Sequence, residues 1–261
     1  MKDNLIQQAA EQLFIAEQNR QPCAPIRNLF GEGLSVADAY RIQQINVERA
    51  IQSGRRCVGK KIGLTSLAVQ QQLGVNEPDF GSIFADKVLM QGQALQTAML
   101  LQPKVEAEVA LVLKRDLPRS DNQLLDMLAA VDYALPAIEV VDSRIQNWDI
   151  RIGDTIADNA SSAAVFLGQQ AVSLKDLDLI QLSMQMSDGE NIVSEGNGKA
   201  CLGNPLWAAT WLANTMAKQG TPLQAGDLIL TGALGPMVNV VAGKTYQAHI
   251  TGLGTVNAEF V

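Results

Sequence analysis

Two glutamates lie within an otherwise almost wholly apolar stretch of this sequence. Glu106 and Glu108 belong to Pro103–Leu113, which is rich in Val, Ala and Leu. In a β-strand, side chains two residues apart point to the same side, so both carboxylates would share one face. Burying two like charges side by side is strongly unfavourable unless a cation lies between them, because an unpaired buried carboxylate takes up a proton instead. The pattern indicates a cation-binding site.

A third acid occurs in the same kind of setting. Glu139 lies in the apolar run Ala134–Asp142. Three converging carboxylates would form an all-oxygen site of the kind that Mg²⁺ or Mn²⁺ prefers. The same acids would also be explained by solvated faces of amphipathic strands, the usual position of glutamate in a strand. The residue pattern alone leaves both interpretations open.

Two adjacent lysines occupy a short apolar stretch bounded by glycines. Lys60 and Lys61 stand in Gly59–Thr65, and strand alternation sends them to opposite faces. If Lys61 approaches the acids, it would neutralise charge or transfer protons, with its pKa lowered by desolvation and raised by the carboxylates. The alternative is a pair of solvated surface lysines.

Three further polar segments have both a structural and a chemical interpretation. Asp79 stands in the predicted turn Glu77–Gly81, where it would fix the loop through backbone N–H groups or act in catalysis. Asn159 and Ser161 would cap local structure or receive a substrate carboxylate. The glycines of Thr231–Val238 permit close backbone approach.

Composition restricts the class of protein. The chain has 261 residues, 47% of them apolar, and a formal charge of −7. This balance predicts a globular enzyme and no nucleic-acid partner, because phosphate binding needs clustered Lys and Arg. No stretch reads as a signal peptide or a membrane helix, so the sequence predicts a cytoplasmic protein with no membrane partner.

Cysteine and histidine usage exclude other chemistries. Cys23, Cys57 and Cys201 have no metal-ligand spacing and are odd in number, so we expect reduced packing residues. His249 is the single histidine, so a histidine-rich zinc site cannot be built. Asp142 and Arg144 are close enough in sequence to form a local surface ion pair, worth at most about 1 kcal/mol.

The order of expected elements predicts an α+β protein. Residues 1–60 form a predicted N-terminal helical region, with a capping box at Ser35, and residues 61–261 form a β-rich catalytic domain. Strands are expected near residues 58–63, 104–113, 135–142, 163–167, 181–187, 227–231, 238–241, 245–250 and 254–260. Helices are expected at Leu67–Leu73, Asn122–Val131 and Pro205–Lys218. Because strands and helices do not alternate, a doubly wound sheet is disfavoured.

Seven segments in this order resemble one family over nearly the whole chain. They are Gly59–Thr65, Gln71–Val75, Pro78–Gly81, Pro103–Glu108, Pro136–Arg144, Ala157–Ser161 and Thr231–Met237. Together they are similar to the 2-hydroxypentadienoate hydratase (2-keto-4-pentenoate hydratase) family of the fumarylacetoacetate hydrolase-like superfamily. The resemblance implies a mixed β-sheet roll or sandwich with an N-terminal helical region.

The resemblance also implies roles for individual residues. By it, Glu106, Glu108 and Glu139 would be ligands of Mg²⁺ or Mn²⁺. The family's motif lysine would fall on Lys61, with Asp79 as its acid/base partner. Ser161 and Asn159 would hold the substrate's carboxylate.

The implied reaction is addition of water to 2-hydroxypenta-2,4-dienoate, a small dienoic acid of aromatic catabolism, to give 4-hydroxy-2-oxopentanoate. Two alternatives use the same scaffold: decarboxylation of 4-oxalocrotonate (2-oxohex-3-enedioate) and hydrolytic C–C cleavage of acylpyruvates. A non-catalytic subunit that stabilises a partner enzyme is a further alternative, against which the metal acids argue. Relatives imply a homo-oligomer, with a downstream aldolase or related decarboxylase as a candidate partner.

Overall fold

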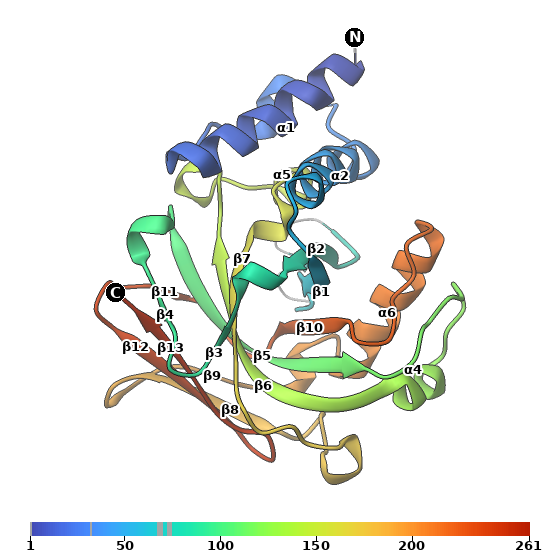
Figure 1. The fold of residues 1–261 in the computed structure, drawn as a ribbon, viewed down its shortest axis with the longest axis vertical. Coiled ribbons are helices and arrows are strands. Elements are labelled where there is room, and N and C mark those ends of the chain that lie inside the picture. The colour runs from blue at the N-terminus through green and yellow to red at the C-terminus, as the bar shows by residue number, and fades with distance from the viewer. Residues whose placement is uncertain (1, 32, 67–69, 72–74) are drawn as a thin grey trace.

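The computed structural model describes residues 2–31, 33–66, 70–71 and 75–261. Figure 1 shows a strongly curved sheet packed against a smaller one, with helices at the ends of the molecule. This arrangement confirms the α+β class and the mixed-sheet fold. The helices are α1 (Lys2–Asn19), α2 (Val36–Gln52), α4 (Leu124–Ala130), α5 (Ile152–Ala157) and α6 (Pro205–Lys218).

The larger sheet runs in the order β2-β1-β10-β5-β6-β7-β3, with β11 pairing with β5. Its strands are β1 (Cys57–Gly63), β2 (Asp79–Phe84), β3 (Val88–Met90), β5 (Pro103–Leu113), β6 (Val131–Asp142), β7 (Ser162–Leu167), β10 (Leu228–Ala233) and β11 (Val238–Asn239). Strand β1 runs parallel to β10, whereas β5 is antiparallel to both β10 and β6. The strands that carry Lys61 and the three glutamates are therefore close neighbours.

The smaller sheet runs in the order β4-β13-β12-β8-β9. Its strands are β4 (Ala94–Leu95), β8 (Ser183–Asp188), β9 (Asn191–Asn197), β12 (Thr245–Ile250) and β13 (Gly254–Phe260). The main core fills the space between the two sheets and beneath α6, where Val109, Phe166 and Phe260 are fully buried. This core fixes one face of β5 and β6 and leaves their other face for the site.

Helices α1, α2 and α5 pack together at one end of the molecule (Figure 1), around a second core that includes Leu13, Ile42 and Ile156. Ser35 caps α2 as predicted, since its Oγ accepts from the Asp38 N–H. The Asp38 carboxylate accepts from the Ser35 hydroxyl and not from the Ser35 backbone N–H, so the second half of the predicted capping box is not formed. The boundary between the helical region and the catalytic domain, placed between residues 60 and 61, remains a prediction. Strand β1 begins before it, at Cys57.

Most of the predicted strands, and the helices at Asn122–Val131 and Pro205–Lys218, are confirmed within a few residues. The helix expected at Leu67–Leu73 lies largely outside the described residues. The prediction of a turn at Asp79 is wrong, because Asp79 begins β2, a strand buried on both sides and therefore without alternation. Strands β3 and β4, polar β9 and six-residue α5 were also absent from the prediction, because they are too short or too polar for a periodic signal.

The remaining polar landmarks are unexceptional. His249 is exposed on β12, with Nδ1 3.2 Å from Thr255 Oγ1. Cys23, Cys57 and Cys201 are free thiols. None of the described helices combines the length and the apolarity that crossing a bilayer requires.

Candidate active site

The three glutamates converge at one point of the large sheet. One carboxylate oxygen from each of Glu106, Glu108 and Glu139 lies within 4.8 Å of the others. The strand register explains this, because Glu106 is paired directly with Glu139 across β5 and β6, and Glu108 follows on the same face. Glu108 and Glu139 are 1% and 0% exposed, so these acids do not lie on a solvated strand face.

Lys61 supplies the positive charge nearest to this cluster. Its Nζ lies 3.3 Å from Glu139 Oε2 and donates a hydrogen bond of 3.0 Å to the carbonyl oxygen of Ala160. The side chain is buried, as expected if it points inward. Lys60 points to the other face and donates to Ser82 Oγ at 2.8 Å. Strand alternation therefore separates the two lysines as the sequence predicts.

Asp79 lies beside Lys61 because β2 pairs with β1, with Asp79 opposite Gly63. A Cβ atom at Gly63 would stand 2.2 Å from Asp79 Oδ1 and 3.5 Å from Lys61 Nζ. The Asp79 carboxylate and the Lys61 ammonium therefore occupy the space that a side chain at this position would need. Asp79 is 1% exposed. Burial raises the pKa of Asp79, against the lowering effect of Lys61. The protonated carboxyl is thereby favoured beside a charged ammonium.

The site carries far more negative than positive charge. Four carboxyl groups surround one ammonium, and burial raises the pKa of Glu106, of Glu108 and, to about 7, of Glu139. Burial alone would lower the pKa of Lys61, but Glu139 and the other acids bring it above its ordinary value. The ammonium therefore stays charged and neutralises only one of the acids.

Several carboxylate oxygens at this site lack a hydrogen-bond partner, although Glu139 Oε2 forms an ion pair with Lys61. Within the described part of the chain, Glu108 Oε1, both oxygens of Glu139 and both oxygens of Asp79 are buried without a hydrogen bond. Unsatisfied buried acceptors are costly, and a cation among them removes the cost. The donor set is all oxygen, which suits a hard divalent ion such as Mg²⁺ or Mn²⁺. The residues therefore fit a divalent metal.

The loop after β10 closes over Glu108. Gly232 N–H donates to Glu108 Oε2 at 2.8 Å, and Gly232 has a φ of 105°. A Cβ at this position would lie 2.2 Å from Thr65 Oγ1. The glycine therefore provides both the unusual backbone angle and the close approach, in agreement with the sequence interpretation of this loop.

A left-handed turn forms another wall of the site. Asn159, Ala160 and Ser161 have φ values of 53°, 50° and 54°, a conformation that costs about 1–2 kcal/mol for each non-glycine residue. Ala160 presents its carbonyl oxygen to Lys61, and Ser161 Oγ lies 3.4 Å from Asp158 Oδ2. Three consecutive strained residues beside the buried acids indicate a turn kept for function.

The side chain of Asn159 is occupied by β2. Its Oδ1 accepts from Ser82 N–H at 2.7 Å, and its Nδ2 donates to the Ser82 carbonyl at 3.0 Å. Both halves of the amide therefore hold the turn against the strand. Asn159 can therefore affect a substrate only indirectly, by holding the turn in position.

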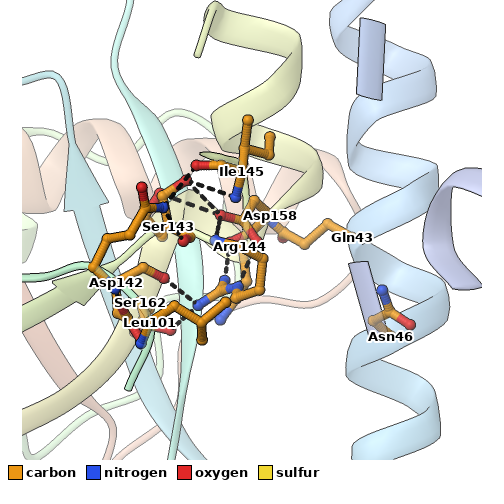
Figure 2. Close-up of polar contacts among 12 residues, drawn as sticks. Gln43, Asn46, Leu101, Asp142, Ser143, Arg144, Ile145, Asp158 and Ser162 are labelled. Carbon is orange, nitrogen blue, oxygen red and sulfur yellow. Dashed lines mark hydrogen bonds and ion pairs between the residues drawn. The ribbon is translucent and has the colours of Figure 1, made fainter. Parts of the chain in front are cut away.

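A buried ion pair anchors the same turn from behind (Figure 2). Arg144 Nε donates to Asp158 Oδ1 at 2.5 Å, and Arg144 also donates to the carbonyl oxygens of Asp142, Asp158 and Ser162. The predicted surface pair between Arg144 and the Asp142 carboxylate is wrong, because that carboxylate accepts from the N–H groups of Leu101 and Gln102 instead.

Arg144 and Asp158 are the site residues to which sequence reasoning gave no role at the site. Both lie inside the quoted motifs, but their pairing joins segments 14 residues apart. The sequence signal that could have identified them is the presence of a charged residue among apolar and small neighbours in each segment.

Comparison with known proteins covers nearly the whole chain. Residues 62–261 match the fumarylacetoacetate (FAA) hydrolase C-terminal family. The chain is 55% identical to 2-keto-4-pentenoate hydratase of Paraburkholderia phymatum, over 99% of this chain and 98% of that protein. It is 52% identical to 2-keto-4-pentenoate hydratase 2 of Dechloromonas aromatica, over 97% and 96%.

Among solved structures, 4-oxalocrotonate decarboxylase from Pseudomonas putida G7, complexed with magnesium and adipate, has a TM-score of 0.95 at 35% identity. The match covers 100% of this chain and 98% of that one. The protein belongs to the fumarylacetoacetate hydrolase family. Within that family it groups with the 2-keto-4-pentenoate hydratases, and the resemblance seen in the sequence motifs is confirmed.

Proposed function

We propose that this protein is a divalent-metal-dependent hydratase that converts 2-hydroxypenta-2,4-dienoate, through its 2-oxo tautomer, into 4-hydroxy-2-oxopentanoate. The observation that carries the proposal is the convergence of Glu106, Glu108 and Glu139 in a chain 50–55% identical to 2-keto-4-pentenoate hydratases over nearly its full length. The identity to these hydratases supports hydro-lyase activity. The three converging carboxylates support the metal requirement.

Glu106, Glu108 and Glu139 would hold Mg²⁺ or Mn²⁺. Three carboxylates leave about half of an octahedral coordination shell open, which is what a bidentate substrate requires. The ion, when bound, supplies Lewis-acid stabilisation to the substrate's carboxylate and 2-oxo group. A magnesium complex of the structurally similar decarboxylase supports a divalent ion of this kind.

Lys61 and Asp79 would move the protons of the reaction. Ketonisation takes a proton from the 2-hydroxyl group and delivers one to C5, which conjugates the 2-oxo group with the C3–C4 double bond. Hydration then places hydroxide on C4 and a proton on C3. Lys61 stays charged beside Glu139 and can donate a proton. Burial raises the pKa of Asp79, so its carboxylate can accept the proton taken from the 2-hydroxyl group or from water and return it as a carboxyl group.

Ser161 would hold the substrate carboxylate, and Asn159 would keep the turn in place for it. The two residues belong to the left-handed turn whose carbonyl at Ala160 positions Lys61. The small hydroxyl of Ser161 is buried and donates to Asp158 Oδ2, and this bond is long at 3.4 Å, so the hydroxyl can reorient towards a substrate. Substrate anchoring and lysine placement are thereby joined in one segment.

The decarboxylase alternative draws on the high structural similarity to 4-oxalocrotonate decarboxylase. The hydratases are favoured because their identity to this chain is 50–55%, against 35% for the decarboxylase. The C–C hydrolase alternative has less support. Fumarylpyruvate hydrolase from Pseudomonas aeruginosa is 15% identical with a TM-score of 0.60, a likeness of fold alone.

The proposal extends to assembly and to the next reaction. Leu125, Leu128 and Trp207 are 76%, 42% and 60% exposed on the adjacent helices α4 and α6, an apolar surface that suits a homo-oligomer. The product is a 4-hydroxy-2-oxo acid, whose C3–C4 bond an aldolase can cleave. An aldolase or a related decarboxylase is accordingly the candidate partner.

The test is an absorbance assay of dienol loss, with and without added Mg²⁺ or Mn²⁺, in parallel with detection of CO₂ and pyruvate. The hydratase predicts metal-dependent loss of the dienol and formation of 4-hydroxy-2-oxopentanoate without either by-product. CO₂ release from 2-oxohex-3-enedioate, or pyruvate release from acylpyruvates, at rates exceeding hydration would replace the proposal with the corresponding alternative.

A further inference from the structure

Helix α2 contacts the strand that carries Asp79. Gln43 lies on the buried face of this helix and is 4% exposed, and Figure 2 shows its side chain extending from α2 towards Asp158. Its Nε2 donates to the carbonyl oxygen of Phe80 at 2.9 Å and to that of Ile156 at 2.8 Å. Two carbonyl acceptors require the NH₂ end of the amide, so both of its protons are used. One side chain therefore joins strand β2 to helix α5.

The two carbonyl groups belong to the residues that follow Asp79 and Thr155 in the chain. Phe80 comes directly after Asp79 in β2, and Ile156 comes directly after Thr155 in α5. Burial raises the pKa of Asp79, while Lys61 and the Thr155 hydroxyl act in the opposite direction, which places Thr155 close to the carboxyl. The amide bridge therefore sets the spacing of the two segments that enclose the Asp79 carboxyl.

The contact of α2 with Phe80 has a second part. The ring of Tyr40 stacks on the ring of Phe80, with centroids 4.5 Å apart and planes inclined by 16°. Tyr40 and Gln43 are three residues apart on α2, so they project from the same side of the helix. Helix α2 therefore holds both the ring and the backbone of the residue next to Asp79.

Helix α5 is also held on the other side of Thr155. The carboxylate of Asp154, which is 0% exposed, accepts from the Arg27 backbone N–H at 2.9 Å and from Arg27 Nη1 at 2.5 Å. The N-terminal region therefore binds α5 immediately before Thr155, at Asp154, and immediately after it, at Ile156. A helix of six residues is too short to be stable by itself, so these contacts decide where Thr155 lies.

The residues that make these contacts precede the part of the chain that matches the family model. That match covers residues 62–261, whereas Arg27, Tyr40 and Gln43 come before it. Their contacts end on β2 and α5, and the three glutamates of the acidic cluster stand on β5 and β6. The N-terminal region therefore acts on the surroundings of Asp79 and leaves the metal-binding strands to the domain itself.

We propose that Gln43 is a positioning residue for proton transfer, which holds β2 against α5 so that the Asp79 carboxyl stays beside Lys61. The inference rests on the proposed role of Asp79 in proton transfer, but not on which of the three candidate reactions the enzyme performs. Without the two hydrogen bonds, Asp79 loses the fixed geometry that efficient proton transfer needs. The signature is a lower kcat with little change in KM or in metal affinity.

The first test compares Gln43→Met with Gln44→Met in the full-length protein. Gln43→Met keeps the length of the side chain but removes both donors. Gln44 is the matched control, because it is the next residue of α2, is exposed and donates to Glu48 at 2.8 Å. We expect Gln43→Met to lower kcat by about tenfold to a hundredfold, while KM and the Kd for Mn²⁺ change less than about threefold. Steady-state kinetics and calorimetric titration with Mn²⁺ measure these values, and Gln44→Met should match the wild type.

A double-mutant cycle separates positioning from general stability. Because Gln43 acts through Asp79, Gln43→Met should lower kcat less than about twofold once Asp79→Asn is present. A loss of equal size in both backgrounds would overturn the proposal, as would an unchanged kcat in Gln43→Met alone. If Asp79→Asn leaves too little turnover to measure, Thr155→Val takes its place, and the loss caused by Gln43→Met should again be smaller than in the wild type.

Thermal melts check that each variant folds. If Gln43→Met does not fold, Gln43→Glu replaces it, because an ionised carboxylate keeps the shape of the amide but donates no hydrogen bond. Failure of both variants to fold would assign Gln43 to stability alone and overturn the proposal.

The outcome can be told apart from that of the proposed function. Wild-type protein that releases CO₂ or pyruvate in place of hydration would replace the proposed function, and the cycle would then follow that reaction. Full turnover of Asp79→Asn would remove Asp79 from the reaction and this inference with it. A large loss in Asp79→Asn together with an additive cycle contradicts only the role of Gln43.

Discussion

The acidic centre and the cavity bounded by α1, α2, β2 and β7 both adjoin the segment 158–162 but balance their charges differently. The centre has four carboxyl groups around one lysine. Each arginine that lines the cavity instead pairs with an acid, as Arg49 does with Glu11, Arg55 with Asp86 and Arg144 with Asp158. The comparison teaches that unpaired buried like charges call for a metal ion, whereas charges that already have partners do not.

The two regions also differ in how their side chains are held. Glu106, Glu108 and Glu139 stand on paired strands, whose register fixes their spacing. Asn46 and Arg49 stand on a helix that packs on other helices through the separate second core. The turn between the regions is strained and is anchored by Arg144 and Asp158. The predictions below test whether each region depends on its own charges.

The largest effect is expected at the acidic centre. Glu108→Gln removes a carboxylate that we propose binds the metal, so it should abolish metal-dependent turnover. The protein should stay folded, because the amide replaces the carboxylate at equal volume. Turnover at saturating Mg²⁺ measures the loss of activity, and far-ultraviolet circular dichroism measures whether the protein stays folded. Glu195→Gln, on the exposed edge of β9, is the control and should remain active. Full activity of Glu108→Gln, or of EDTA-treated enzyme, would contradict the metal assignment.

The next effect concerns the ion pair behind the turn. The pKa of Asp158 is raised to about 6 by burial, against the lowering effect of Arg144, so its carboxylate is charged at about pH 8. Arg144→Met should reduce the free energy of unfolding by about 3–5 kcal/mol, since it leaves that charge buried and unpaired. Denaturant titration measures the loss. The exposed Arg151→Met is the control, and Arg144→Met combined with Asp158→Asn should recover much of the stability.

A smaller effect is expected from the two lysines, which adjoin each other in sequence but lie on opposite faces. Lys61→Ala should lower kcat by at least about a hundredfold, because it removes the group that we propose transfers protons. Lys60→Ala should leave kcat within a few-fold, since Lys60 contacts Ser82 on the other face. Steady-state kinetics of both variants make the measurement. Equal losses would remove Lys61 from the reaction.

The smallest effect is a pH dependence of stability to which the acidic centre contributes. The pKa of Glu139 is raised from 4.5 to about 7 in the folded, metal-free protein, chiefly by burial. The folded state therefore holds this proton more tightly than the unfolded state, so the stabilisation is complete below the unfolded pKa and is lost as pH rises through about 7. Calorimetry of the metal-free protein should show a Tm that falls by a few degrees between about pH 5 and about pH 8.

Two comparisons sharpen this prediction. Glu139→Gln cannot ionise and should weaken the dependence without removing it, because burial also raises the pKa of Glu106, Glu108 and Asp79. Saturating Mg²⁺ should also weaken it, because the ion pairs the carboxylates. A metal-free Tm that rises over this pH range would mean that Glu139 is already ionised at low pH.

The sequence determined much of the acidic centre because its parts are local. Alternation along one strand fixes that Glu106 and Glu108 share a face and that Lys60 and Lys61 do not. The cost of burying like charges then calls for a cation. Long strands such as β5 and β13, and helix α6 with proline at its start, carry periodic signals strong enough to be read directly.

Only the tertiary structure decided what lies between elements. The pairing of Glu106 with Glu139 depends on strand register. The position of Asp79 over Gly63 depends on a buried strand that shows no alternation. The salt bridge from Arg144 to Asp158 depends on a left-handed turn. The cavity bounded by α1, α2, β2 and β7 joins elements that no local pattern brings together. The physical reason is that periodicity specifies the face on which a side chain stands, whereas its partner is chosen by long-range packing.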